Sequence, residues 1–144
     1  MERKPAELIA DRLHSAAIHV LRRVRRRDDA SGVGPAQLSA LSVLVFGGAT
    51  TLGGLAAAEQ VRPPTMSRIV ASLKSSGLVE TISDQQDARR LRIRATAKGT
   101  KLLQRARERR IDYLAEHLDR LLAQELEQLN SAIDVIRKVL EEWE

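Results

Sequence analysis

Arginine dominates one short segment of this sequence, DQQDARRLRIRATAKG, which covers residues 84–99 and contains four arginines. A guanidinium group donates hydrogen bonds in a fixed fork that suits phosphate and carboxylate oxygens. The arginines flank a short apolar alternation, and Asp87 comes two residues before Arg89. These residue types point to recognition of an anion by a small exposed hairpin.

The other residues that could carry chemistry show no catalytic or metal-binding spacing. His14, His19 and His117 form no H-E-x-x-H pattern, and the chain has no cysteine. No glycine-rich phosphate loop follows a strand-like segment, and no nucleophile elbow is present. We therefore expect a protein that is not an enzyme and that needs no metal and no cofactor.

Positive charge is concentrated in the middle of the chain, whose 144 residues carry a net charge of +5. Residues 1–61 hold 8 basic and 6 acidic side chains, residues 62–101 hold 9 and 3, and residues 102–144 hold 7 and 10. A local basic region beside an acidic end favours nucleic acid as the partner. The five arginines of residues 22–27 fit a helix end, where cations suit the dipole, and a phosphate contact equally well.

No membrane segment is expected. The N-terminus is charged, and no apolar run approaches the roughly 18 residues that a membrane span requires. We predict a soluble, cytoplasmic protein.

The elements that position the arginines follow from apolar spacing and helix punctuation. Apolar residues three and four apart predict a long helix over residues 8–24, and Pro35 and Gly47 bracket a second helix. A short helix follows within residues 50–61 and begins with a threonine that can cap it. Residues 78–83 and 90–96 alternate like two short strands, and Thr96 can cap a final helical region.

The helix that begins after Arg62 has two different faces. Two prolines occupy its first turn, Gly77 ends it, and one face is apolar, with Met66, Ile69, Val70 and Leu73. The opposite face is small or hydrogen-bonding apart from one arginine, and can approach another molecule closely. This outer face comprises Pro64, Arg68, Ala71 and Ser75, flanked by Thr65, Ser67 and Ser72.

Helix, short helix, helix with a polar outer face and basic hairpin are, in this order, the elements of a winged helix-turn-helix. In that design the second helix of the pair enters the major groove, and the side chains near its N-terminus reach base edges. Thr65, Ser67 and Arg68 are the candidates for these contacts. Arg68 suits bidentate bonding to guanine and a phosphate contact equally well.

The hairpin is expected to serve as the wing. Leu91, Ile93 and Ala95 fall on one side of its second strand, and Arg90, Arg92 and Arg94 fall on the other. The loop DQQDARR would carry its charge to the adjacent minor groove, where a narrow A/T-rich segment attracts an inserted arginine. We expect Arg89 at the tip, with Asp87 accepting hydrogen bonds from it and fixing its direction.

A second apolar stripe near the C-terminus predicts a partner chain. Leu126, Leu129, Ile133, Ile136, Leu140 and Trp143 alternate by three and four residues. Packing within the chain could cover this stripe, but a core with one Phe, one Tyr and one Trp favours long helices that stabilise one another between two chains. We predict a homodimer.

The segments LAAAEQVRPPTMSRIVASLKSSGLVE and DQQDARRLRIRATAKG resemble the recognition helix and wing of the MarR (multiple antibiotic resistance regulator) family. The family's wing motif, an Asp with a following Arg and a Thr-x-x-Gly that closes the second strand, falls on Asp87, Arg89, Thr96 and Gly99. The resemblance covers nearly the whole chain. Two departures are Arg62, where the family often has a capping serine, and the small Ala88 and Ala95 in the wing.

This resemblance implies a mainly α fold with a small β-hairpin wing in one domain, 1–144. Residues 35–99 would form the DNA-binding lobe, and residues 1–30 and 100–144 the dimerisation helices. It also implies a homodimeric transcriptional regulator, usually a repressor, that binds a pseudo-palindromic operator in double-stranded DNA. The expected DNA-binding residues are Arg62, Pro64, Thr65, Ser67, Arg68, Ser72, Arg89, Arg90 and Arg92.

The resemblance further implies release from DNA by a small, commonly aromatic or phenolic, effector. The family's pocket lies between the dimerisation helices and the DNA-binding lobe, which directs attention to His14, His19 and Tyr113. As an alternative, the chain would be an adaptor or antirepressor whose winged helix binds an acidic protein surface and no operator. Duplex binding and its salt dependence separate these two hypotheses.

Overall fold

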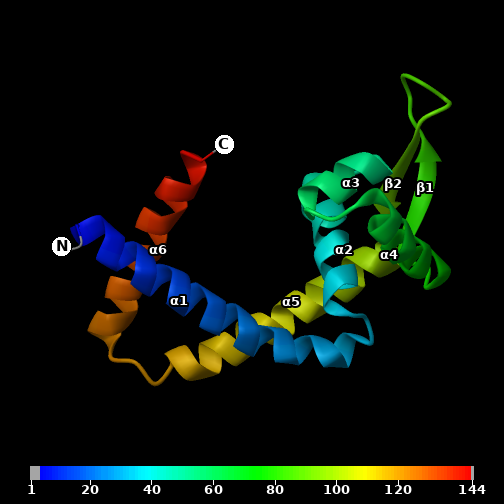
Figure 1. Cartoon of the computed structure of the whole chain (residues 1–144). Coiled ribbons are helices and arrows are strands. Elements are labelled where there is room, and N and C mark those ends of the chain that lie inside the picture. Colours follow the sequence, from blue (N-terminus) through cyan, green and yellow to red (C-terminus); the bar gives the residue numbers. More distant parts are fainter. Residues whose placement is uncertain (1–3, 144) are drawn as a thin grey trace. The chain divides into compact units, whose positions relative to one another are not determined.

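The computed structural model describes residues 4–143 and confirms a mainly helical chain with one small hairpin (Figure 1). The elements, in chain order, are α1 (Pro5–Arg25), the 3-10 helix η1 (Arg26–Ser31), α2 (Pro35–Gly47), α3 (Leu52–Ala58), α4 (Pro63–Ser75), β1 (Val79–Ser83), β2 (Leu91–Ala95), α5 (Ala97–Leu118) and α6 (Ala123–Glu141). Each predicted element is present, and η1 is an addition that the arginine-rich run did not predict.

The chain divides into two compact units, Met1–Arg110 and Ile111–Glu144, so the boundary falls within α5. The first unit contains α1 to β2 and the first part of α5, and the second contains the end of α5 and all of α6. The predicted assignment of residues 35–99 to DNA binding lies wholly within the first unit.

Proline, threonine and glycine set the helix boundaries. Pro35 begins α2, and Gly48 follows it with φ +82°, a conformation that favours glycine. The Thr51 hydroxyl caps α3 by accepting a hydrogen bond from the Gly54 amide at 3.1 Å, as its position predicted. These caps make the α2–α3 turn short and well defined.

The core of the first unit lies between α2, α3, α4 and the hairpin. Its members are almost all aliphatic, and both strands contribute to it. Deep burial of so many branched side chains fixes how each helix is rotated about its axis. The largest fully buried side chains are Leu38, Leu41, Leu55, Met66, Leu73 and Leu78.

The hairpin is antiparallel and pairs Thr81 with Ile93. Thr50 extends the pairing from the α2–α3 turn, since its amide donates to the Ile93 carbonyl at 3.1 Å and the Ile93 amide donates to the Thr50 carbonyl at 2.7 Å. Ile93 is buried as predicted, but Leu91 is 59% exposed, because it pairs with Ser83 at the far end of the hairpin. The predicted apolar side of β2 therefore reaches the core through Ile93 and, partly, Ala95.

The start of α5 is tied to the end of α4. The Thr96 hydroxyl donates to the Gly77 carbonyl at 2.6 Å and accepts from the Gly99 amide at 3.1 Å, so it caps α5 as predicted. Gly99 is buried, and a Cβ placed on it would lie 2.1 Å from the Leu78 carbonyl oxygen. The Thr-x-x-Gly motif is therefore a capping threonine followed by a glycine that admits backbone contact.

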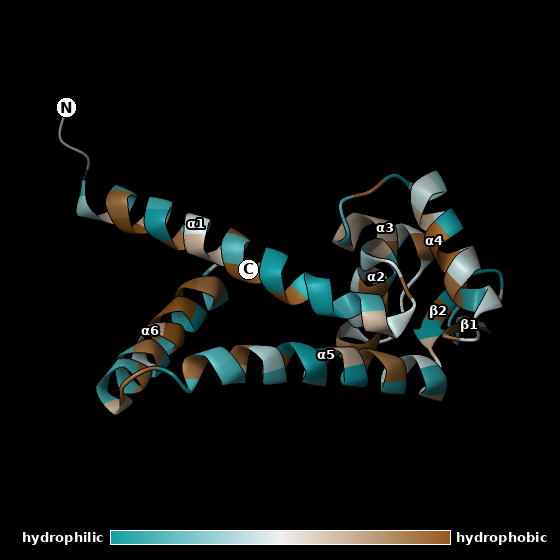
Figure 2. Ribbon diagram, turned by 90° about the horizontal axis from the view of Figure 1, so that it is seen from below, coloured by the Kyte–Doolittle hydropathy of each residue, from teal (hydrophilic) through white to brown (hydrophobic). Residues whose placement is uncertain are grey.

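The terminal helices present apolar side chains that the chain itself does not cover. No described residue of α6 is buried, and Ile133, Leu140 and Trp143 are 45%, 48% and 76% exposed. Ile9 on α1 is 64% exposed, and Figure 2 shows brown, hydrophobic segments along both helices.

Among the described residues, no single helix is long and apolar enough to cross a membrane. Of the helices described, only the pair Pro5–Ser31 and Pro35–Gly47, bent by 92°, meets the length and composition test when taken together.

Gly99→Ala should destabilise the protein, because the new Cβ would collide with backbone and not with a flexible side chain. We expect the free energy of unfolding to fall by about 1–3 kcal/mol in urea denaturation. Gly53→Ala is the matched control, since a Cβ there meets open space, and it should leave stability unchanged or raise it by up to about 1 kcal/mol. Equal stabilities for the two variants would contradict the close approach.

Candidate nucleic-acid interface

The outer face of α4 is free of contacts with the core. Met66 and Leu73 are 0% and 1% exposed and anchor the inner face, whereas Thr65, Ser67 and Arg68 are exposed. Pro64, Ala71 and Ser75 are exposed on the same side. The predicted division of α4 into an apolar face and a polar face is confirmed, with Ile69 and Val70 half-buried between them.

The N-terminus of α4 offers few backbone donors. Pro63 and Pro64 have no amide hydrogen, and the Met66 amide donates to the Arg62 carbonyl at 3.1 Å. Arg62 occupies the N-cap position without a side-chain cap, so the helix begins at Pro63 although the capping serine is missing. An anion at this end would meet the Arg62 side chain more than backbone amides.

The loop between β1 and β2 is shaped by two aspartates. The Asp84 carboxylate accepts from the Gln86 amide at 3.0 Å, and the Asp87 carboxylate accepts from the Arg89 amide at 3.0 Å. Asp87 thus fixes the backbone at Arg89, whereas the sequence predicted a bond to its side chain. Arg89 and Arg90 are exposed in this loop, which projects from the end of the hairpin (Figure 1).

The arginines within β2 are engaged in the fold. Arg92 is half-buried, and its Nη2 donates to the Ala49 carbonyl at 2.7 Å. Arg94 pairs with Glu80 on β1, with 2.6 Å between Nε and Oε1. Arg92 thus ties the wing to the α2–α3 turn, and its predicted contact with DNA stays a prediction.

Comparison with known proteins identifies the family. The MarR family model matches residues 31–90, which run from the end of η1 to the loop of the hairpin. A protein of Mycobacterium tuberculosis described as an HTH-type transcriptional regulator is 37% identical over 134 residues, 93% of this chain and 94% of that relative. The chain belongs to the MarR family. It is a helix-turn-helix transcriptional regulator.

Solved structures show the same fold. A MarR family protein from Bacillus stearothermophilus superposes with a TM-score of 0.82 at 22% identity, covering 98% of this chain and 99% of that one. A MepR mutant from S. aureus, crystallised bound to an oligodeoxyribonucleotide, superposes with a TM-score of 0.68 at 20% identity, covering 96% and 99%. The winged helix-turn-helix fold predicted from the order of elements is confirmed.

Ser72 has a contact within the MarR lobe that the sequence did not predict. Its hydroxyl accepts a hydrogen bond of 2.6 Å from the Gln37 side-chain amide, which joins α4 to the start of α2. Ser72 is half-buried where α2 and α4 meet, and its predicted contact with DNA stays a prediction. Nothing in the local spacing of α4 distinguishes Ser72 from the exposed Ser67.

The arginine-rich run ends at a buried ion pair. Asp28 on η1 is 2% exposed and receives two hydrogen bonds from Arg110, the first from Nε to Oδ1 at 2.7 Å. The hydrogen bonds that Arg110 donates to the Asp28 carboxylate raise the pKa of Arg110 above its ordinary value and outweigh desolvation, so the guanidinium stays charged. Arg22, Arg23, Arg25, Arg26 and Arg27 are exposed.

The residues expected near an effector pocket lie on exposed or terminal segments. His14 and His19 are exposed on α1. Tyr113 lies in the second unit beside His117, with 4.6 Å between their ring centroids. Their pocket role stays a prediction.

Arg92→Met tests the tie between the wing and the α2–α3 turn. Methionine keeps an unbranched stem but cannot donate to the Ala49 carbonyl, so we expect the free energy of unfolding to fall by about 1 kcal/mol. Arg90→Met, at an exposed position two residues away, should change it by less than about 0.5 kcal/mol. Urea denaturation of both variants would show indistinguishable midpoints if Arg92 served only as a surface charge.

Proposed function

We propose that this MarR family regulator is a homodimeric, sequence-specific DNA-binding protein that represses transcription and is released by a small effector. One observation carries the proposal: the polar face of α4 and the arginines of the hairpin loop are exposed together in one compact unit, while the opposite faces are buried. A helix and a cationic loop exposed side by side suit a major groove and the neighbouring minor groove.

Within α4, the side chains near the N-terminus are placed to read bases. Thr65, Ser67 and Arg68 are exposed in the first two turns, the part of a recognition helix that reaches base edges. Arg62, Pro64 and Ala71 border them, and the missing amides at the two prolines leave phosphate binding at this end to Arg62. We assign sequence reading to Arg68, with Thr65 and Ser67 supplying exposed hydroxyl groups in the same two turns.

The wing supplies the second contact. The Asp87 carboxylate holds the Arg89 backbone, which lowers the entropy that Arg89 would lose on entering a narrow groove. Arg90 adds a second exposed charge at the same loop. The DNA-bound MepR neighbour supports duplex DNA as the partner of this surface.

A second copy of the chain is the proposed partner of the terminal helices. An isolated α6 with no buried residue would leave its apolar stripe in water, which costs about 25 cal/mol per Å² of apolar surface. Pairing two copies through α1 and α6 removes this surface and sets two recognition helices on one duplex. Half-sites should then lie about 34 Å apart, one helical turn.

Repression and effector release follow from the same surface. A dimer seated on an operator blocks other proteins from that DNA, and a ligand that binds the DNA-free form more tightly lowers operator affinity. His14, His19 and Tyr113 are the proposed pocket residues on the terminal helices. Transcription from an operator-bearing template with and without the protein checks repression, and adding a candidate effector to the protein-containing sample checks release.

Arg89→Ala should weaken operator binding with little loss of stability, because Arg89 is exposed and its side chain has no role in the core. Using a duplex selected from random sequences, we expect about five- to hundredfold weaker binding in fluorescence anisotropy, and a salt slope reduced by about one. Arg12→Ala, which removes the same charge from exposed α1, is the control and should bind nearly as well as wild type.

Equal operator affinity for Arg89→Ala and wild type would remove the wing from the interface. Wild-type affinity should also fall by orders of magnitude between about 50 and 200 mM salt if several phosphates are neutralised. No duplex binding at the lower salt concentration would overturn the regulator proposal and favour an adaptor that binds an acidic protein surface. A footprint of one unpaired half-site would contradict the dimer.

Ile133→Asp should dissociate the dimer, because it places a charge in the apolar stripe of α6. Light scattering after size-exclusion chromatography should show a dimer for wild type and a monomer for the variant. Ser131→Asp adds the same charge two residues away, off the stripe, and should remain dimeric. A monomeric wild type, or two variants of the same mass, would refute pairing through this stripe.

A further inference from the structure

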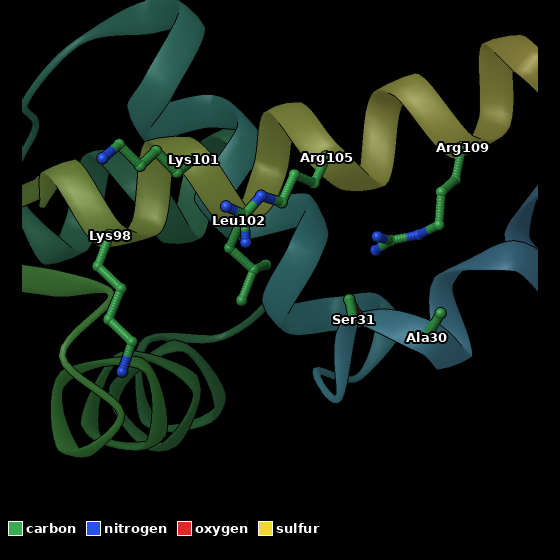
Figure 3. Close-up of a pocket in the computed structure, with 7 residues that line it drawn as sticks. All are labelled: Ala30, Ser31, Lys98, Lys101, Leu102, Arg105 and Arg109. Atoms are coloured by element: carbon green, nitrogen blue, oxygen red, sulfur yellow. The ribbon is translucent and has the colours of Figure 1, made fainter.

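A cavity of about 260 Å³ lies between η1 and the first part of α5, wholly within the first compact unit. Its α5 wall is cationic: Lys98, Lys101, Arg105 and Arg109 line it, with Leu102 among them, and Ser31 faces them from η1 (Figure 3). Among the described residues, none that lines it is acidic, and none belongs to the wing or the recognition helix. It is therefore a separate site.

The spacing of the four cations puts them on one side of α5. Intervals of three, four and four residues make them neighbours along this side of the helix, where like charges repel one another. Lys98 and Lys101 also stand near the positive end of the helix dipole, and the first turn of α5 has no acidic residue. The repulsion among the cations and their position near the positive helix end both raise the free energy of the unliganded protein. An anion bound beside them would offset both effects.

Arg109 carries the second observation. Its Nε is buried and has no hydrogen-bond partner among the described residues. The adjacent Arg110 differs, because it takes both carboxylate oxygens of Asp28, the buried acid on η1. The ion pair therefore compensates the charge of Arg110, whereas Arg109, which lines the cavity, keeps a buried donor without an acceptor among the described residues.

We infer that this cavity binds a small organic anion with at least two negative charges, whose apolar part lies against Leu102. The charge follows from the four cations, which a single carboxylate or a phenol would leave largely uncompensated. The small volume and the wall formed by η1 favour a small molecule over a DNA backbone. The inference rests on the proposed effector response; it names the chemical class of an effector and places it in this cavity, not beside His14, His19 and Tyr113, which do not line it.

Lys98 connects this cavity to the recognition helix. Lys98 lines the cavity, and its ammonium donates to the Ser76 carbonyl, at the C-cap of α4, at 2.9 Å. An anion that drew the ammonium inward would remove this bond from the end of α4. Anion binding and operator binding would then oppose each other, by the same factor in both directions.

The test is calorimetric titration of the full chain with four benzene derivatives whose charge runs from zero to three: benzamide, benzoate, isophthalate and benzene-1,3,5-tricarboxylate. At constant ionic strength the affinity should rise with charge, and benzamide should not bind. Arg109→Gln should weaken tricarboxylate binding about tenfold or more. Arg107→Gln removes the same charge from an exposed position of α5 outside the cavity and should change it less than about twofold.

If Arg109→Gln does not fold, Arg105→Gln provides a second measurement of tricarboxylate affinity. Arg105 lines the cavity but is exposed, so its replacement should not disturb folding. The inference would be overturned if the tricarboxylate did not bind, or if affinity did not depend on the charge of the probe. It would also be overturned if Arg107→Gln lost as much tricarboxylate affinity as the cavity variants. So would an Arg109→Gln variant that loses random-duplex affinity while its tricarboxylate titration is unchanged, since the cations would then serve DNA.

Operator affinity measured on the same samples separates the two proposals. Operator binding without tricarboxylate binding refutes the anion site and leaves the DNA-binding regulator standing. Tricarboxylate binding without operator binding refutes the regulator and supports the site alone. With both present, the tricarboxylate should weaken operator binding in wild type, and weaken it less in Lys98→Met.

Discussion

The rotation of α4 about its own axis is the constraint on which the DNA-binding surface depends. Met66 and Leu73 are completely or almost completely buried in an aliphatic core, and a turn of the helix by one residue, about 100°, would bring at least one of them into solvent. Everything on the outer face follows from that anchoring. Thr65, Ser67 and Arg68 face outward because their neighbours in the sequence cannot.

The same lobe divides its arginines between structure and surface. Arg92 and Arg94 lie within β2, where the Ala49 carbonyl and the Glu80 carboxylate are within reach, and each takes its partner. Arg89 and Arg90 lie beyond the strand, in a loop whose own aspartates bond to backbone amides. Within the hairpin, the arginines of the loop are therefore exposed without a role in the fold, whereas those of β2 bond to neighbouring segments.

The sequence predicted what local signals determine. Apolar spacing placed α4 and its buried face, the two prolines placed its first turn, and Thr96 placed the start of α5. These signals act within one or two turns of chain, so they can be read without knowing the fold. The resemblance of the recognition helix and wing to one family added the functional class.

Contacts between distant segments could not be predicted in this way. Arg92 and Ala49 are 43 residues apart, Gln37 and Ser72 are 35 apart, and the pair on η1 and α5 is 82 apart. Alternation along β2 likewise put Leu91 with Ile93, but it could not show that the hairpin extends past the core at Leu91. A partner that only the fold brings close turns an apparent surface arginine or serine into a structural one.

The junction between α4 and α5 shows how an event on α5 can reach the recognition helix. α4 ends in a Schellman turn, with the Leu78 amide bonded to the Leu73 carbonyl and Gly77 at φ +72°. The start of α5 contacts the same turn in two ways. The Thr96 hydroxyl donates to the Gly77 carbonyl, and Gly99 lies close to the Leu78 carbonyl. A displacement of the first turn of α5 therefore cannot leave the end of α4 where it was, because no flexible linker separates them.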